Sequence, residues 1–171
     1  MFATPALWTA FIAMTPLMIL TAFWDLKHLK IPNWLVLCVL ATFVITGIWG
    51  LPLDTFAWRL LYGAVALVIG FGLFALGAIG GGDAKMAAVL VPFAMPSDVG
   101  MLLLLYALMT LFLLMAVRLA MQIVRHQETG WLALDQLHKP ARERVFPMGL
   151  IFGSTILLYL GIQTGSSLGI L

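Results

Sequence analysis

The sequence predicts an all-α integral membrane protein with about six transmembrane helices, formed by one membrane-embedded domain over residues 1–171. Hydrophobic residues make up 63% of the chain and charged residues only 9%, and the mean hydropathy is +1.10. Soluble domains carry about 25% charged residues, so the composition excludes that class. The charged residues also leave five charge-free windows, each close to the roughly 20 residues that cross a hydrocarbon core. These windows are 1–24, 31–53, 60–82, 99–117 and 145–171.

The first window is expected to be a helix of the mature protein. It has neither the basic start nor the clean small-x-small cleavage site of a secretory signal peptide. Pro16 is expected to kink this helix, because proline removes a backbone hydrogen bond. A sixth, shorter window, 86–97, contains Pro92 and Pro96. Since it follows a glycine run directly, it predicts a short or broken span that begins near Gly82.

The basic residues divide unevenly between the two sides of this topology. One side receives the connections 25–33, 80–85 and 125–146. Its basic residues are Lys27, Lys30, Lys85, Arg125, Lys139, Arg142 and Arg144. The other side receives both termini, with Arg59 alone at its edge. By the positive-inside rule the basic side faces the cytoplasm and both termini lie outside.

Two further patterns concern packing. Small residues four positions apart predict close helix–helix contacts in lipid. These pairs are Gly77 and Gly81, Gly149 and Gly153, and Gly161 and Gly165. The polar stretch 125–144 could form a short amphipathic face on the membrane surface. It is expected to be a solvated connector, with a substrate-contacting role as the alternative.

Two aspartates, Asp25 and Asp83, fall on the same side of the membrane at the ends of predicted spans. Asp25 ends the first helix in "AFWDLK", and Asp83 follows three glycines in "GGGDAK". Ionisable groups near hydrocarbon are costly and indicate functional sites. The structural alternative for Asp83 is that it caps a helix N-terminus. Asp25 would oppose the dipole of its own helix, so its alternative is a loop aspartate without a function. Two carboxylates on one side of a bundle can share a proton and activate a water molecule.

Three short motifs occur in a recognisable order. Asp25 stands several residues before "IPN" at 31–33, "GGGD" at 80–83 is followed by x-K, and "PMG" stands at 147–149. Together they resemble the prepilin peptidases, or type IV leader peptidases, which are GxGD-type intramembrane aspartyl proteases. The resemblance spans nearly the whole chain. Met148 departs from the pattern, because an aromatic residue is more usual there.

The resemblance implies that Asp25 and Asp83 are the catalytic pair. The residues that it implies shape the site are Gly80, Gly81, Gly82, Lys85, Pro32, Asn33, Pro147 and Gly149. Judged from the residues alone, Asn33 would cap the second helix and Pro32 would end the preceding turn. The helix ends suggest that Asp83, beside Lys85, is the base and that Asp25 is the acid, although coupled carboxylates titrate as a pair.

The implied activity is that of an aspartic endopeptidase in the bacterial inner (plasma) membrane. It would remove the short leader of a type IV prepilin or pseudopilin, after a glycine and at the cytoplasmic face. Larger family members carry paired CxxC motifs with an N-methylation activity, but this chain has one cysteine. It therefore resembles the short peptidases of Flp, or tight-adherence, pilus systems, which predicts cleavage without methylation.

The expected partners are a prepilin with a hydrophobic N-terminal helix and the lipid bilayer, with no nucleic acid, and the oligomeric state is left open. No cofactor or metal is expected, because His28, His126 and His138 lack a metal-binding spacing and Cys38 is expected to pack among apolar residues. Two alternative functions are a proton- or ion-coupled transporter subunit and a catalytically idle scaffold for pilus assembly or secretion.

Overall fold

The structure is a computed structural model that describes residues 3–123 and 147–167, and within those ranges it is helical with no strand. The expected connector or surface segment at 125–144 lies outside these residues. The helices are α1 (Thr4–His28), α2 (Asn33–Gly50), α3 (Leu53–Ala75), α4 (Gly81–Leu90), α5 (Val99–Ile123) and α7 (Met148–Ser167). The prediction of an all-α fold is confirmed for the described part of the chain.

Five helices of the described residues are long and apolar enough to cross a membrane: α1, α2, α3, α5 with the turn before it, and α7. The sixth expected span is broken. Its helix α4 has ten residues and rises only about 15 Å. Two short 3₁₀ turns, Val91–Phe93 and Pro96–Asp98, then lead into α5. Each turn contains a proline, which cannot donate the hydrogen bond that would continue an α-helix.

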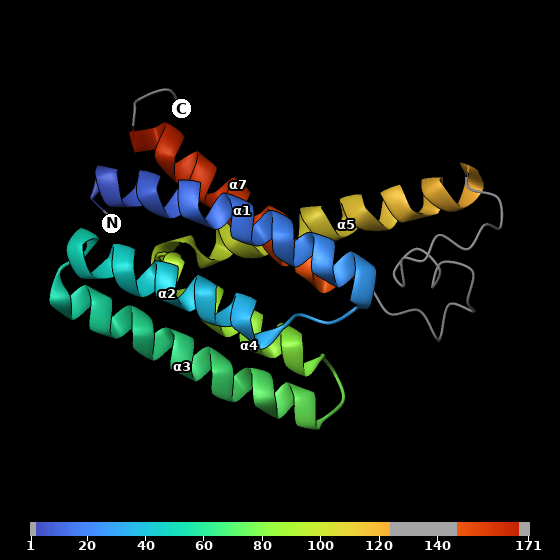
Figure 1. The fold of residues 1–171 in the computed structure, drawn as a ribbon, viewed down its shortest axis with the longest axis horizontal. Helices are drawn as coiled ribbons and strands as arrows, with labels where there is room; N and C mark the ends of the chain where they lie inside the picture. The colour runs from blue at the N-terminus through green and yellow to red at the C-terminus, as the bar shows by residue number, and fades with distance from the viewer. Residues whose placement is uncertain (1–2, 124–146, 168–171) are drawn as a thin grey trace.

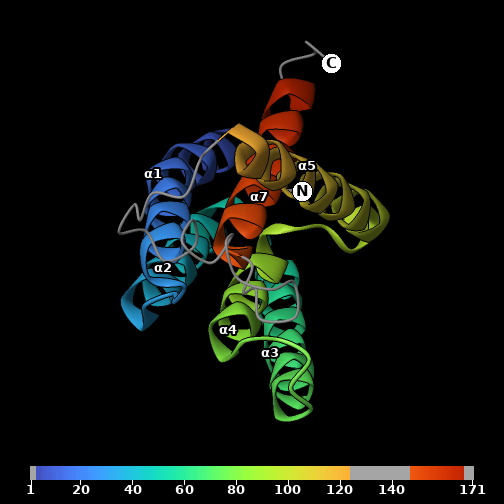
Figure 2. The same ribbon diagram turned by 90° about the vertical axis from the view of Figure 1, so that its right-hand side faces the viewer.

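The helices begin and end at two opposite ends of the bundle. Figure 1 shows the C-terminal ends of α1 and α3 beside the beginnings of α2 and α4, while the two chain termini lie at the other end. Figure 2 shows α3 and α4 side by side and α7 between α1 and α5. This arrangement brings both aspartate-bearing segments to the same end of the molecule.

Glycines allow two of the helix pairs to pack closely. A side chain on Gly63 would meet the Ala88 carbonyl oxygen at 2.9 Å, and one on Gly70 would meet the Ala84 Cβ at 3.0 Å, so α3 and α4 touch through these positions. Gly153 of α7 packs in the same way on α1, where Met18 lies 3.3 Å from the added Cβ. The expected pairing of Gly77 with Gly81 is wrong. Gly77 follows α3 with φ +72°, in open space, and supplies a left-handed turn that favours glycine.

Arg59 lies within the bundle instead of at the membrane edge where the sequence placed it. Its side chain is 2% exposed, and its guanidinium donates to the carbonyl oxygens of Pro92 and Phe93, both at 3.3 Å. The break in the chain around these prolines leaves carbonyl groups without helical partners, and Arg59 supplies donors for them.

The same irregular segment is tied to α7 by a second set of bonds. The Tyr159 hydroxyl donates to Asp98 Oδ2 at 2.8 Å, and the Gln163 amide donates to the same oxygen at 2.7 Å. The Met95 backbone N–H donates to the Tyr159 hydroxyl at 3.1 Å. Arg59 also interacts electrostatically with Asp98 and Tyr159, so the cluster connects α3, the 91–98 segment and α7.

Arg59→Met is expected to lower the free energy of unfolding by about 2 kcal/mol, the usual contribution of hydrogen bonds to a charged group. Thermal unfolding in detergent, followed by circular dichroism, measures the change. Arg118→Met is the control, because Arg118 of α5 is exposed. Equal melting temperatures for the two variants would show that the cluster contributes nothing to stability.

Candidate active site

The Asp25 carboxylate lies between two helices. It comes from the last turns of α1, is 5% exposed, and accepts a hydrogen bond of 2.7 Å from the backbone N–H of Gly149. Gly149 is the second residue of α7, where backbone N–H groups have no partner within the helix and the helix dipole favours negative charge. Asp25 therefore lies at the C-terminal end of its own helix, as expected, and α7 supplies a second, favourable helix end.

Asp83 is the third residue of α4, whose N-cap is Gly80. Its carboxylate accepts a hydrogen bond from the Gly80 backbone N–H, as an acidic residue at this position of a capping box does. The alternative that Asp83 caps its helix is thus part of its role. Both carboxylates accept a hydrogen bond from a backbone N–H at a helix N-terminus, Asp25 from α7 and Asp83 from α4, so helix ends no longer distinguish a base from an acid.

Both aspartates line one cavity of about 690 Å³ at the end of the bundle that holds the first turn of α4. Their charges are close enough to interact. The other walls come from the α1–α2 connection, from the turn between α3 and α4, and from the start of α7. These residues are Leu29, Lys30, Ile31, Gly77, Ala78, Ile79, Gly80, Gly81, Gly82 and Met148.

Lys85 and Asn33 join the two motif regions directly. The Lys85 ammonium donates to Asn33 Oδ1 at 3.2 Å, from α4 to the start of α2. The expected capping of α2 by Asn33 is wrong, because α2 has no side-chain cap and its N-cap residue is Pro32. Asn33 instead helps to hold the helix that bears Asp83 beside the connection that follows Asp25.

Lys85→Ala and Asn33→Ala are each expected to lower the cleavage rate by roughly tenfold, and the double variant by little more, because residues in one hydrogen bond are not additive. A double-mutant cycle on initial cleavage rates measures the coupling. Lys27→Ala is the control, since Lys27 is exposed near the same end of the bundle. Fully additive losses would show that the two side chains act separately.

The remaining residues of the late motif are placed beside Asp25. Pro147 is buried directly before α7, and Met148 lines the cavity. A side chain on Gly149 would lie 2.9 Å from Asp25 Cβ and 3.0 Å from Oδ2. The structure thus brings this motif to the first aspartate, and Gly149 and Gly153, the expected small-residue pair, both pack on α1.

The three glycines before Asp83 differ in the space around them. A side chain on Gly80 would lie 2.7 Å from Asp83 Oδ2, whereas the nearest atoms to added side chains on Gly81 and Gly82 lie at 3.4 and 3.6 Å. Gly80 has an ordinary extended conformation, with φ −73°. Glycine is therefore required at position 80 for space and not for backbone conformation.

Gly80→Ala is expected to displace the Asp83 carboxylate and to lower the cleavage rate by roughly a hundredfold, since small misplacements of catalytic groups are costly. Gly81→Ala is the matched comparison, because its added methyl group would make only ordinary contact with the Phe74 ring. Initial rates on the same substrate measure both. If Gly81→Ala lost as much activity as Gly80→Ala, space beside the carboxylate would not be the reason for glycine.

Sequence reasoning missed one residue near the site. Tyr106 of α5 is close enough to Asp83 for the two groups to interact electrostatically. The centroids of the Tyr106 and Phe152 rings lie 5.6 Å apart. The available signal was a single hydroxyl-bearing residue within the apolar stretch 99–109. Within residues 3–123 and 147–167, no three side chains of His, Cys, Asp or Glu form a group that could hold a metal ion.

Comparison with known proteins gives one match. A family model described as the type IV leader peptidase family matches residues 12–119, a range that includes both aspartates. No curated protein and no solved structure matches.

Proposed function

This chain belongs to the type IV leader peptidase family, and from that premise we propose that it is an aspartic endopeptidase that cleaves Flp-type prepilins with Asp25 and Asp83. The family and the apolar helices make it a multi-pass membrane protein whose role is that of a leader peptidase. The proposal adds the catalytic residues, the type of pilin, the face of the membrane and the absence of methylation.

One observation carries the proposal: two carboxylates from separate helices line the same cavity. Two neighbouring carboxyl groups hold one proton between them over a range of pH, because like charges at short distance cannot both ionise easily. The pair then offers a base and an acid at once, and its titration belongs to both groups together.

The proposed chemistry needs only these two groups and a water molecule. The ionised carboxylate takes a proton from water, whose oxygen attacks the carbonyl carbon of the scissile peptide. The protonated carboxyl group gives its proton to the carbonyl oxygen, so a neutral gem-diol forms. The carbon–nitrogen bond then breaks as the leaving nitrogen takes a proton from the pair and one hydroxyl of the gem-diol returns a proton to it, so that a new carboxyl group and a new amino terminus form and the pair again holds one proton.

Charge supports the placement of this site at the cytoplasmic face of a bacterial inner membrane. Lys27, Lys30 and Lys85 lie in the helix ends and connection at the same end of the bundle as both aspartates, and Lys30 lines the cavity. Basic residues concentrate on the cytoplasmic side of membrane proteins. A bond at this end of the bundle would lie just outside the hydrocarbon, where water is available.

Cysteine usage supports cleavage without N-methylation. The chain has one cysteine, Cys38, which lies in α2 on the exposed surface. Paired CxxC motifs are therefore absent from the sequence. The family resemblance links their absence to short peptidases that do not methylate the new terminus, and to Flp systems.

Co-expression with an Flp-type prepilin in bacterial membranes tests the proposal. The expected result is a shorter pilin, seen by gel shift, whose new amino terminus has the mass of an unmodified residue. The variant with both Asp25→Asn and Asp83→Asn should leave the prepilin intact at equal expression. Cleavage by that double variant would refute the aspartate mechanism, and a methylated product would refute the absence of methylation.

A further inference from the structure

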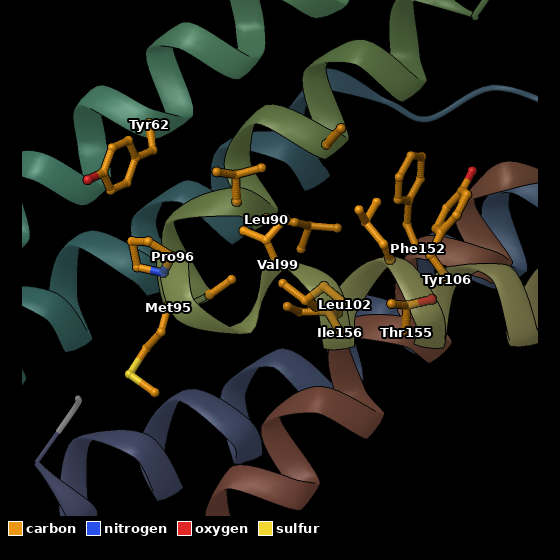
Figure 3. Close-up of a pocket in the computed structure, with 14 residues that line it drawn as sticks. Tyr62, Leu90, Met95, Pro96, Val99, Leu102, Tyr106, Phe152, Thr155 and Ile156 are labelled. Atoms are coloured by element: carbon orange, nitrogen blue, oxygen red, sulfur yellow. The ribbon is translucent and has the colours of Figure 1, made fainter.

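An apolar groove of about 540 Å³ lies along α4, between α3 on one side and α5 and α7 on the other (Figure 3). It shares no lining residue with the cavity that holds the aspartates. Its walls include Tyr62 of α3, Ala87 and Leu90 of α4, Leu102 and Leu103 of α5, and Phe152 of α7. Ligand sites in proteins have volumes of about 300–1,000 Å³, so the groove is large enough to receive part of another molecule.

The groove is open because residues 3–123 and 147–167 cover α5 poorly. No residue of the span Pro96–Ala116 is buried, whereas α7 has eight buried residues among its 20. Figure 2 shows α5 against α7 and apart from α3. The α5 surface that faces α4, from Val99 to Tyr106, rises about 10 Å and forms roughly two helical turns. An added apolar helix would complete the packing there.

The groove begins one helical turn from Asp83 and one helical turn from Gly149, the residue whose N–H binds Asp25. Ala87 follows Asp83 by one turn of α4, and Phe152 follows Gly149 by one turn of α7. Tyr106 lies at the same end of the groove and interacts electrostatically with Asp83. From there the groove continues to Met95 and Pro96 near the other side of the bundle. If a substrate is cleaved in the cavity, the residues that follow its cleavage site would lie at this groove.

A threonine side chain lies in this largely apolar wall. Thr155 is 6% exposed and lines the groove, and its Oγ1 has no hydrogen-bond partner among the described residues. Thr21, Thr46 and Thr164, by contrast, each donate to the carbonyl four residues earlier in their own helix. Because protein atoms cover this hydroxyl, it does not distinguish a peptide from a lipid tail. The choice of occupant depends on the position of the groove, one helical turn from Asp83.

We propose that this groove holds the hydrophobic helix that follows the cleavage site of the prepilin, so that Leu103 and its neighbours select substrates by that helix. This inference rests on the proposed function. On this inference the cavity binds the leader and the cleavage site of the substrate. The groove binds the membrane-embedded helix of the substrate. Packing of an apolar helix against α5 and α4 then fixes the depth at which the bond meets the aspartates.

Cysteine cross-linking in membranes tests the position of the substrate helix. Cys38→Ser removes the native thiol, and Leu103→Cys and Leu104→Cys form a matched pair, because both are exposed (65% and 60%) and only Leu103 lines the groove. Each is tested in an Asp83→Asn background against prepilins with single cysteines along the hydrophobic segment. Leu103→Cys should give at least fivefold more adduct, at positions three or four residues apart. Equal adducts from both positions, or adducts only between two copies of the peptidase, would overturn the proposal.

Kinetics separate this inference from the proposed function. Leu103→Trp fills the groove and should raise KM about tenfold for the full-length prepilin, while kcat and the cleavage of a peptide that ends shortly after the cut stay unchanged. Leu104→Trp should change neither substrate. If the wild-type enzyme cleaved neither substrate, the proposed peptidase function would be refuted. If Leu103→Trp cleaved both substrates at wild-type rates, or lost the same fraction of its cleavage rate on both, only the proposed role of the groove would be refuted. A photoreactive acyl lipid that labels Leu103 equally with and without prepilin would also overturn it.

Discussion

Asp25→Asn and Asp83→Asn are each expected to lower the rate of prepilin cleavage by about a thousandfold or more, since each removes one half of the acid–base pair. The double variant should lose no more than either single variant, because the two groups act as one unit. Initial cleavage rates in membranes, normalised to the amount of each protein, measure all three.

Asp54→Asn is the matched control for the aspartate variants. It makes the same chemical change at an exposed position at the start of α3, and it should cleave at the wild-type rate. The prediction fails if either single variant keeps more than a tenth of that rate. Losses that multiply in the double variant would indicate two independent roles and not a shared proton.

Gly149→Ala should lower cleavage by roughly a hundredfold while the protein still inserts and folds. The added methyl carbon would lie 2.9 Å from Asp25 Cβ, 3.0 Å from Oδ2 and 3.1 Å from Cγ. Atoms do not approach this closely, so the carboxylate must move away from the Gly149 N–H that now binds it at 2.7 Å. Displacement of a catalytic group by about 1 Å can cost a factor of 10².

Gly161→Ala provides the comparison within α7. Its added methyl group would lie 3.7 Å from the Phe11 ring, an ordinary contact. This variant should cleave normally and melt at nearly the wild-type temperature. If Gly149→Ala were as active as Gly161→Ala, the bond from α7 to Asp25 would have no part in catalysis.

The periodicity of charge and hydropathy predicts most of the fold, because a lipid environment forces long charge-free stretches to become helices. It also predicts the break near Pro92 and Pro96 and the shared end of the bundle for Asp25 and Asp83. It does not predict Arg59 as a buried donor, since that depends on carbonyl groups released more than thirty residues later. Gly63 and Gly70 were likewise missed, because they stand seven positions apart, whereas only pairs four apart were considered.

The site was predicted by motif and not by geometry. No rule of spacing brings the Gly149 N–H to the Asp25 carboxylate, because the two lie in different helices far apart in sequence. The contact between Lys85 and Asn33 is equally non-local. Composition can identify an ionisable group as unusual, but its partners depend on tertiary packing.

The bond between α7 and Asp25 has a consequence for the time at which activity arises during synthesis. Both aspartates precede α7 in the chain, in α1 and α4. Until α7 inserts and its first turn reaches Asp25, the cavity lacks Met148 and the N–H that binds the carboxylate. On the proposed mechanism, a chain whose α7 has not yet inserted carries both aspartates without an assembled site, and we expect cleavage only after α7 has inserted.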